Sequence, residues 1–303
     1  MLSCHWQLRR YAVDVQSAFV VMARPKHQQV ALKRAAEIQR LKGARLRLVA
    51  FCWNAMCEQA DIFSVSQRRA MKREIIRQRE VWLREQVRDF GLADSQVSIE
   101  VRWTDDIARW VSEHVEEDVV IKSVHHSKTL THTPLDWQLF RECPKPIYIA
   151  STRRRKPSGN VLATIDLRHT NAKHQALNLR VLEAAQEFAH IRNATLQVVN
   201  VVEFSQALRD LDVIDAQVVR REAVARNREL LDALLQPFGV KRKSVHMPVG
   251  KVGQMVAATA AKIDADMLVV GTCARRGAGG LLLGNSAERI LTKAPCDVLA
   301  VHP

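Results

Sequence analysis

Short apolar runs rich in β-branched residues alternate along this chain with longer stretches whose apolar residues recur every three or four positions. In the second half, runs of the first kind occupy residues 161–165, 196–202, 245–248, 267–270 and 297–301. Stretches of the second kind cover residues 216–236, 253–265 and 286–293, and another carries Leu177, Val181, Leu182 and Ala185. The pattern predicts strands that alternate with amphipathic helices.

The first half repeats this order. Strands are predicted at residues 19–23, 46–51, 97–101, 119–121 and 147–150, with helices at 30–41, from Ser66 onward and at 107–115. Matching landmarks keep a nearly constant separation, which is 142 residues for Arg24 and Asp166, 148 for Asp118 and Asp266, and 151 for Pro144 and Pro295. An internal duplication is the simplest explanation.

Alternating strands and helices of these lengths predict an α/β fold with a parallel sheet covered on both faces. Residues 151–160, STRRRKPSGN, read as a solvated boundary because a basic run there meets Pro, Ser and Gly. We assign residues 1–152 to a first domain, 153–159 to a basic linker and 160–303 to a second domain. The strands at 147–150 and 297–301 are expected to pair the two domains as a pseudo-dimer, which would protect an exposed edge.

Composition narrows the class of protein. Hydrophobic residues make up 47% of the chain, but their runs are far shorter than the roughly 20 residues of a membrane span. Because the N-terminus also lacks the apolar stretch of a secretion signal, we expect a cytoplasmic protein. The six cysteines form no CxxC pair, and His125, His126 and His132 lack a Cys or carboxylate partner in sequence, so no metal site is predicted.

The net charge of +14 is uneven, with 28 Lys and Arg against 18 Asp and Glu in residues 1–156, and 18 against 14 in the remainder. Much of the excess positive charge lies along the helix predicted from Ser66, which is its expected N-cap. The apolar stripe of this helix carries Ile76, Leu83, Val87 and Phe90. Its basic face suits an acidic protein partner or a nucleic acid, but interleaved Glu74, Glu80 and Glu85 suit a solvated surface equally well. Without a base-reading motif, no sequence-specific nucleic-acid binding is expected.

The segment with the clearest chemistry is residues 267–290, MLVVGTCARRGAGGLLLGNSAERI, in which a buried strand ends at Gly271 and a Gly-rich loop leads to a helix. A parallel strand delivers such a loop to the carboxyl edge of the sheet, where open α/β folds bind ligands. Glycines allow close approach of an anion, and the amides of a helix N-terminus can bind phosphate oxygens. Arg275 and Arg276 add positive charge.

This loop resembles the signature of the universal stress protein family, which is Gly, two residues, Gly, nine residues, Gly and a hydroxyl residue. Gly271 and Gly284 fit, whereas Ala274 replaces the second glycine and Asn285 the hydroxyl residue, with Ser286 next. The GNSAE ending, the duplication and the segment HHSKTLTHTPLDWQLFRECPKPIYI in the first half are similar to tandem-domain members. The resemblance covers nearly everything after about residue 15.

The resemblance implies a five-stranded parallel sheet in each domain and, where the loop is intact, ATP held between the loop and an acidic residue after the first strand. Here that residue is Asp166. An Asp that directly follows a strand is also commonly a turn former or a helix cap. The expected ligand is ATP or another phosphorylated small molecule. The predicted nucleotide-binding residues are Asp166, Gly271, Thr272, Arg275, Gly277, Gly284, Asn285 and Ser286.

The departures weaken this phosphate site. Ala274 adds a methyl group where close approach is needed, although Gly277, Gly279 and Gly280 would leave the loop flexible enough for a shifted cradle. In the first half, Arg24 stands in the place of Asp166, Ser123 in that of Gly271, and Thr133 and Pro134 in those of Gly284 and Asn285. That domain is expected to keep the fold and to lack the phosphate loop.

Three functions remain open on the sequence. The first is a stress-response protein that binds an adenine nucleotide in its second domain and, as the resemblance implies, supports endurance of stress that includes DNA-damaging agents. The second is an interaction or adaptor protein with two vestigial pockets, which could form a homodimer or bind an acidic protein. The third is a weak ATPase or autophosphorylating protein with Ser286 as acceptor. No catalytic residues are assigned, because no P-loop lysine, Ser-His-Asp set or carboxylate pair is evident.

Overall fold

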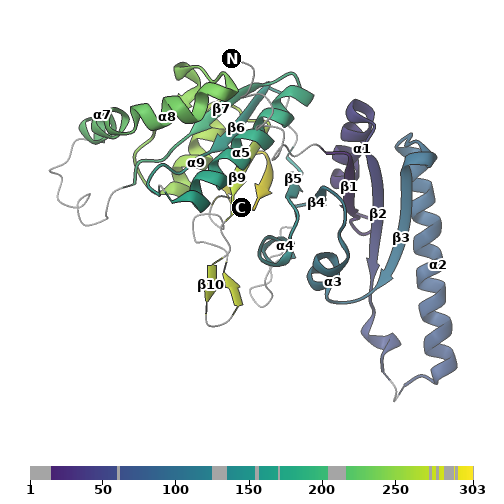
Figure 1. The fold of residues 1–303 in the computed structure, drawn as a ribbon. Helices are drawn as coiled ribbons and strands as arrows, with labels where there is room; N and C mark the ends of the chain where they lie inside the picture. Colours follow the sequence, from purple (N-terminus) through teal and green to yellow (C-terminus); the bar gives the residue numbers. More distant parts are fainter. Residues whose placement is uncertain are drawn as a thin grey trace. The chain divides into compact units, whose positions relative to one another are not determined.

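The computed structural model describes residues 15–302 except 60–61, 125–134, 154–156, 170, 204–215, 273–274, 278–279, 283–289 and 291–292. Within it the chain forms two compact units, residues 15–152 and residues 153–303. Each unit is an α/β structure built on a parallel sheet (Figure 1).

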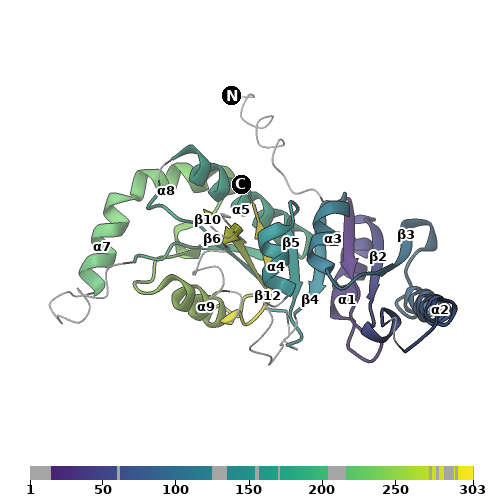
Figure 2. The same cartoon turned by 90° about the horizontal axis from the view of Figure 1, so that it is seen from below.

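The N-terminal unit alternates strands and helices along the chain. Its sheet has the order β3-β2-β1-β4-β5, and each neighbouring pair is parallel. Helices α1 and α2 lie on one face, and α3 and α4 pack together on the other (Figure 2). The bounds are β1 Ser17–Val21, α1 Val30–Lys42, β2 Arg45–Cys52, α2 Val65–Asp89, β3 Val97–Trp103, α3 Ile107–His114, β4 Val119–Ser123, α4 Leu135–Glu142 and β5 Ile147–Ala150.

The C-terminal unit repeats the topology, with the parallel order β12-β9-β6-β7-β8. Helix α5 packs on β6, β7, β9 and β12, and α9 follows β8. The bounds are β6 Asn160–Thr164, α5 Ala172–Ile191, β7 Thr195–Val199, α7 Ala216–Arg226, α8 Arg228–Leu235, β8 Val245–His246, α9 Val252–Lys262, β9 Met267–Gly271, β10 Arg275–Gly277, β11 Gly280–Leu282 and β12 Asp297–Val301.

The central strands are apolar on both faces, as expected of parallel strands covered by helices on either side. Every residue of β12 and of β5 is buried, and only the terminal residues of β9, β6 and β1 are less than fully enclosed. The predicted class, α/β with a five-stranded parallel sheet in each half, is therefore confirmed. The pseudo-dimer remains a prediction.

Three local expectations were wrong. Helix α2 begins two residues earlier than predicted, because Ser64 and Gln67 form a reciprocal capping box in place of a cap at Ser66. The single helix expected at 216–236 divides into α7 and α8 at Asn227, whose side-chain amide donates to the carbonyl of Ala223 and competes with helical bonding. Helix α4 was not predicted at all, since its apolar face spans only two turns.

In the part of the chain that the structure describes, no helix is both long and apolar enough to cross a membrane.

The protonation of one buried glutamate in the C-terminal unit is coupled to folding. Glu183 lies on α5 with 9% of its surface exposed, and its Oε2 has no hydrogen-bond partner among the described residues. Burial raises the pKa of Glu183 to about 7, and the nearby Arg180 only partly opposes the shift. The folded protein therefore binds this proton more tightly than the unfolded chain, in which a glutamate titrates at roughly 4.3.

Replacement of Glu183 by Gln should change how stability depends on pH. Because the folded pKa is the higher one, the free energy of unfolding falls as pH rises from about 4.5 to about 7. Glu183→Gln should thus match the parent at pH 5 and be more stable at pH 8, by on the order of 1 to 3 kcal/mol. Urea unfolding followed by circular dichroism measures this, with exposed Glu222→Gln as the control. Parallel pH profiles for parent and Glu183→Gln would contradict it.

Candidate functional site

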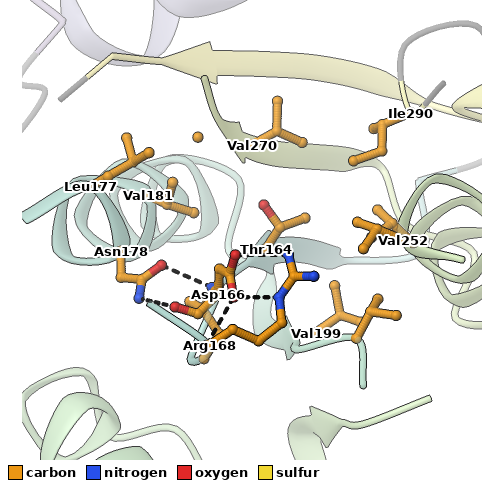
Figure 3. Close-up of a pocket in the computed structure, with 14 residues that line it drawn as sticks. Thr164, Asp166, Arg168, Leu177, Asn178, Val181, Val199, Val252, Val270 and Ile290 are labelled. Carbon is orange, nitrogen blue, oxygen red and sulfur yellow. Dashed lines mark hydrogen bonds and ion pairs between the residues drawn. The ribbon is translucent and has the colours of Figure 1, made fainter. Parts of the chain in front are cut away.

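A cavity of about 150 Å³ opens at the carboxyl ends of β6, β7 and β9 in the C-terminal unit (Figure 3). Strands β6 and β9 are neighbours in the sheet, but the chain leaves them in opposite directions. This is the switch point at which open α/β sheets bind ligands. The cavity is lined by Thr164, Ile165, Asp166, Arg168, Leu177, Asn178, Val181, Val199, Val201, Val252, Val256, Val270, Gly271 and Ile290.

The walls of the cavity are mostly aliphatic. Val181 of α5 faces it from one side and Val252 of α9 from the other, while Val199 and Val270 come from the strands (Figure 3). An apolar cavity of about this volume in another protein takes up a benzene ring. The cavity therefore has room for one flat ring, with polar groups only at its mouth.

The polar mouth is an ion pair between Asp166 and Arg168. The Arg168 guanidinium donates to both carboxylate oxygens, with Nε to Oδ1 at 3.0 Å and NH2 to Oδ2 at 2.9 Å, and its NH1 reaches Glu203 Oε2 at 2.5 Å. The backbone amide of Arg168 also donates to Asp166 Oδ1 at 2.9 Å. Burial favours the protonated acid, but these donors hold the pKa of Asp166 below its ordinary value. Asp166 is therefore an ionised turn former whose acceptor sites are already in use.

Two buried amides fix the loop that carries this pair. Asn178 of α5 accepts from the amide of Asp166 at 2.9 Å and donates to its carbonyl at 2.9 Å, as the dashed lines in Figure 3 show. Asn200, after β7, accepts from the amide of Leu167 at 3.3 Å. These bonds satisfy the amide and carbonyl of Asp166 and the amide of Leu167, and they hold Asp166 at the mouth of the cavity.

Gly271 serves close packing rather than an open approach for an anion. A Cβ atom built on it would lie 2.7 Å from Cγ of Leu177, much nearer than two carbon atoms approach each other. Leu177 therefore packs directly on the end of β9, and glycine is needed there for helix α5 to lie close to the sheet. On the side where a Cβ atom would project, Leu177 already covers Gly271.

The other predicted site residues do not gather at this cavity in the described structure. Thr272 is buried, and its hydroxyl lies 2.8 Å from Nδ1 of His302 and 3.2 Å from the carbonyl of Val301, so it contacts the end of β12. Arg275 and Gly277 belong to an antiparallel hairpin formed by β10 and β11, rather than to an open loop. Gly284, Asn285 and Ser286 lie outside the described residues.

The corresponding strand position in the N-terminal unit carries a buried ion pair. Lys122 of β4 stands 148 residues before Val270 and pairs with Asp136 in the first turn of α4. Both side chains are about nine-tenths buried, and Lys122 Nζ also donates to the carbonyl of Ser123 at 2.9 Å. The Asp136 carboxylate thus lies at the start of α4, the helix that corresponds in sequence to the end of the predicted phosphate loop in the C-terminal half.

Two of the replacements noted in the sequence also have local partners. The Ser123 hydroxyl accepts from the amide of Ala31 in the first turn of α1 at 2.9 Å. The carbonyl of Arg24 accepts from Gln29 and from the amide of His27, while the Arg24 side chain is exposed. Pro134 and the three histidines at 125, 126 and 132 lie outside the described residues, and elsewhere no group of three or more potential metal ligands was found.

The fold and the cavity place the chain among α/β proteins with a ligand-type switch point in one of two repeated units. Comparison with known proteins is more specific. The model of the universal stress protein family matches residues 172–302. Universal stress protein A homolog 1 of Coxiella burnetii is 35% identical over 148 residues, which are 47% of this chain and 94% of the relative. The chain belongs to the universal stress protein family.

Two further comparisons extend over both halves. Universal stress protein E of Salmonella typhi is 26% identical over 298 residues, covering 95% of this chain and 94% of the relative. The crystal structure of a universal stress protein from Archaeoglobus fulgidus DSM 4304 is 12% identical and superposes with a TM-score of 0.63 over 95% of this chain and 99% of that chain. The former confirms the resemblance to tandem members, and the latter confirms the fold.

Sequence reasoning missed the residues that decide the state of the cavity. Arg168 follows Asp166 by two positions, so its competition for the carboxylate could have been suspected from the spacing. Asn178 stands within the apolar stripe of α5, and a polar residue in such a stripe signals a buried hydrogen bond. The contact of Leu177 with Gly271 had no signal in the sequence, because it depends on how closely α5 approaches β9.

Substitution of Gly271 by Ala tests the packing role. The new methyl group would collide with Leu177, so Gly271→Ala should destabilise the protein by about 1 to 3 kcal/mol. In a Leu177→Ala background the same change should cost much less, because the colliding side chain is gone. Urea unfolding of the four proteins in this double-mutant cycle measures the coupling. Strictly additive losses would show that the two residues do not pack as described.

The Lys122–Asp136 pair can be followed in the N-terminal unit, because five of the six tryptophans lie in residues 15–152 and residues 153–303 contain none. Lys122→Met leaves a buried carboxylate without its cation and should cost about 3 to 5 kcal/mol. The double variant Lys122→Met/Asp136→Leu should recover most of that loss. Tryptophan fluorescence during urea unfolding reports both. A double variant as unstable as the single one would contradict the account.

Proposed function

We propose that this chain is a cytoplasmic stress-response protein whose C-terminal unit binds an adenine nucleotide or a related phosphorylated ligand. The observation that carries the proposal is the aliphatic cavity at the β6–β9 switch point, with Asp166 and Arg168 at its mouth. A purine ring would enter between Val181 and Val252. The ribose hydroxyls would then lie near Asp166, and the phosphates near Arg168.

Binding in this pocket requires an exchange of partners at its mouth. Arg168 now neutralises Asp166 and Glu203, so an incoming phosphate would compete for its guanidinium. Each contact released would free a carboxylate oxygen for a ribose hydroxyl. The guanidinium is matched to phosphate as well as to carboxylate, so the exchange replaces one charge-assisted contact by another. Affinity should accordingly be moderate.

Family membership supports the cellular side of the proposal. Because the chain matches universal stress protein E of Salmonella typhi along nearly its full length, we infer a role in stress endurance, including resistance to DNA-damaging agents. This role makes no demand for catalysis, and a weak ATPase or autophosphorylating activity at Ser286 remains the third hypothesis.

A second candidate function has its own support. The engaged carboxylate of Asp166, the contact of Leu177 on Gly271 and the Lys122–Asp136 pair all favour an adaptor whose pockets are vestigial. Its basic surface would then bind an acidic protein. Mass spectrometry of small molecules that co-purify with the protein separates the two, because a nucleotide supports the first function and an empty pocket the second.

Calorimetric titration of ATP locates the site. Asp166→Ala should weaken binding by roughly 1 to 3 kcal/mol, the scale of hydrogen bonds to a charged group. Arg24→Ala, at the corresponding position of the N-terminal unit, should leave the affinity unchanged and serves as the matched control. If binding were weakened by Arg24→Ala alone, or equally by both variants, the assignment of the site to the C-terminal unit would be wrong. Absence of any heat with the parent would favour the adaptor.

A further inference from the structure

A second and larger hollow of about 730 Å³ lies between helices α7 and α8 and the strand β8 at the edge of the C-terminal sheet. It shares no lining residue with the cavity at the switch point. The first of its helices, α7, stands away from the sheet of its own unit (Figures 1 and 2). The hollow is within the range of volumes, about 300 to 1,000 Å³, that ligand sites occupy.

The floor of this groove, which we call the edge groove, is apolar. It is formed by Leu231 and Leu235 of α8, Val245 of β8 and Met247, with Val224 of α7 opposite. Val224 lines the groove and leaves 39% of its surface exposed. An exposed valine beside an apolar floor indicates a surface that a further apolar group would cover.

The rim of the edge groove is strongly cationic, with Arg220, Arg221, Arg228 and Arg242 against the single acid Asp232. Arg242 is held by Asp232 at 2.6 Å, and Arg221 makes only a long bond of 3.5 Å to the carbonyl of Gln217. Arg220 and Arg228 form no ion pair with any described residue. Two guanidinium groups are thus available beside an apolar floor, which is the arrangement that recognises an anionic head group joined to an apolar body.

The duplication places a related groove in the N-terminal unit, between α2 and β3, with a volume of about 490 Å³. At a separation of 148 residues Val87 matches Leu235, Val97 matches Val245 and Ile99 matches Met247, all of them lining residues. The two charged positions are also matched, but with opposite signs. Arg84 corresponds to Asp232, and Asp94 corresponds to Arg242. Both halves therefore have an apolar floor at this place, but only the groove of the C-terminal unit combines the larger volume with the two available arginines.

We propose that the edge groove of the C-terminal unit binds an anionic amphiphile, namely a single acyl chain that carries a carboxylate or phosphate head. The chain would lie on Leu231, Leu235 and Met247 and cover Val224. The anionic head group would bind the guanidinium groups of Arg220 and Arg228. A groove of this volume suits one acyl chain, and such a ligand accounts for both the exposed Val224 and the two guanidinium groups without an ion pair to a described residue. This ligand site is separate from the proposed nucleotide site.

The test uses the full chain and dodecanoate as the probe, titrated by calorimetry and by displacement of the fluorescent fatty acid cis-parinaric acid. One dodecanoate per chain should bind. Dodecanol, which has the same tail without a charge, should bind at least about tenfold more weakly. Arg228→Gln should weaken dodecanoate by a similar factor, and Val224→Asp should abolish binding because it sets a carboxylate opposite the floor. Both positions are exposed, and circular dichroism checks that the fold is retained.

The matched control is Val81→Asp, an exposed valine of the N-terminal groove, which should leave dodecanoate binding unchanged. Sedimentation with phosphatidylglycerol vesicles distinguishes the source of the chain: vesicle binding lost in Val224→Asp indicates a membrane lipid, and dodecanoate binding alone indicates a free fatty acid. Equal affinity for dodecanol, equal loss in Val81→Asp, or no effect of Val224→Asp would overturn the proposal. So would displacement of the fluorescent probe by a glutamate-rich amphipathic peptide but not by dodecanoate, which would indicate a protein partner.

Discussion

The parallel pairing of β6 with β9 is the constraint on which the functional part of this structure depends. Because all strands of a parallel sheet point the same way, the segments that follow β6 and β9 emerge side by side, although about a hundred residues separate them. The register sets Val161 opposite Met267, and so carries Asp166 and Gly271 to one cavity.

The two halves place different side chains at matching positions of one topology. Val270 lines the cavity in the C-terminal unit, while Lys122 occupies the matching strand position and pairs with Asp136 in the N-terminal unit. Burying two charges is costly, and the pair repays that cost only when both partners are present. The matching strand position is thus charged and paired in the N-terminal unit, whereas it is aliphatic and lines the cavity in the C-terminal unit.

The sequence was sufficient for the fold because the relevant signals are periodic. Strand runs, helix spacing and the nearly constant offset between halves predict two similar sheets, and the described topology agrees. The state of the site could be predicted only in part. Asp166 and Gly271 do line one cavity, but the hold of Arg168 on Asp166 and of Leu177 on Gly271 depends on distances that no pattern encodes. The pairing of β10 with β11 was not predicted either, since the glycines of this segment were interpreted as a flexible loop.

If the C-terminal unit holds the nucleotide site and the N-terminal unit holds none, each chain should bind one nucleotide. Native mass spectrometry of the protein with a modest excess of ATP counts bound molecules directly. The account predicts a single ATP per chain, which Val252→Trp should remove by filling the cavity between α9 and the sheet. Two molecules per chain would show that the N-terminal unit binds a nucleotide as well, and none would contradict the nucleotide function itself.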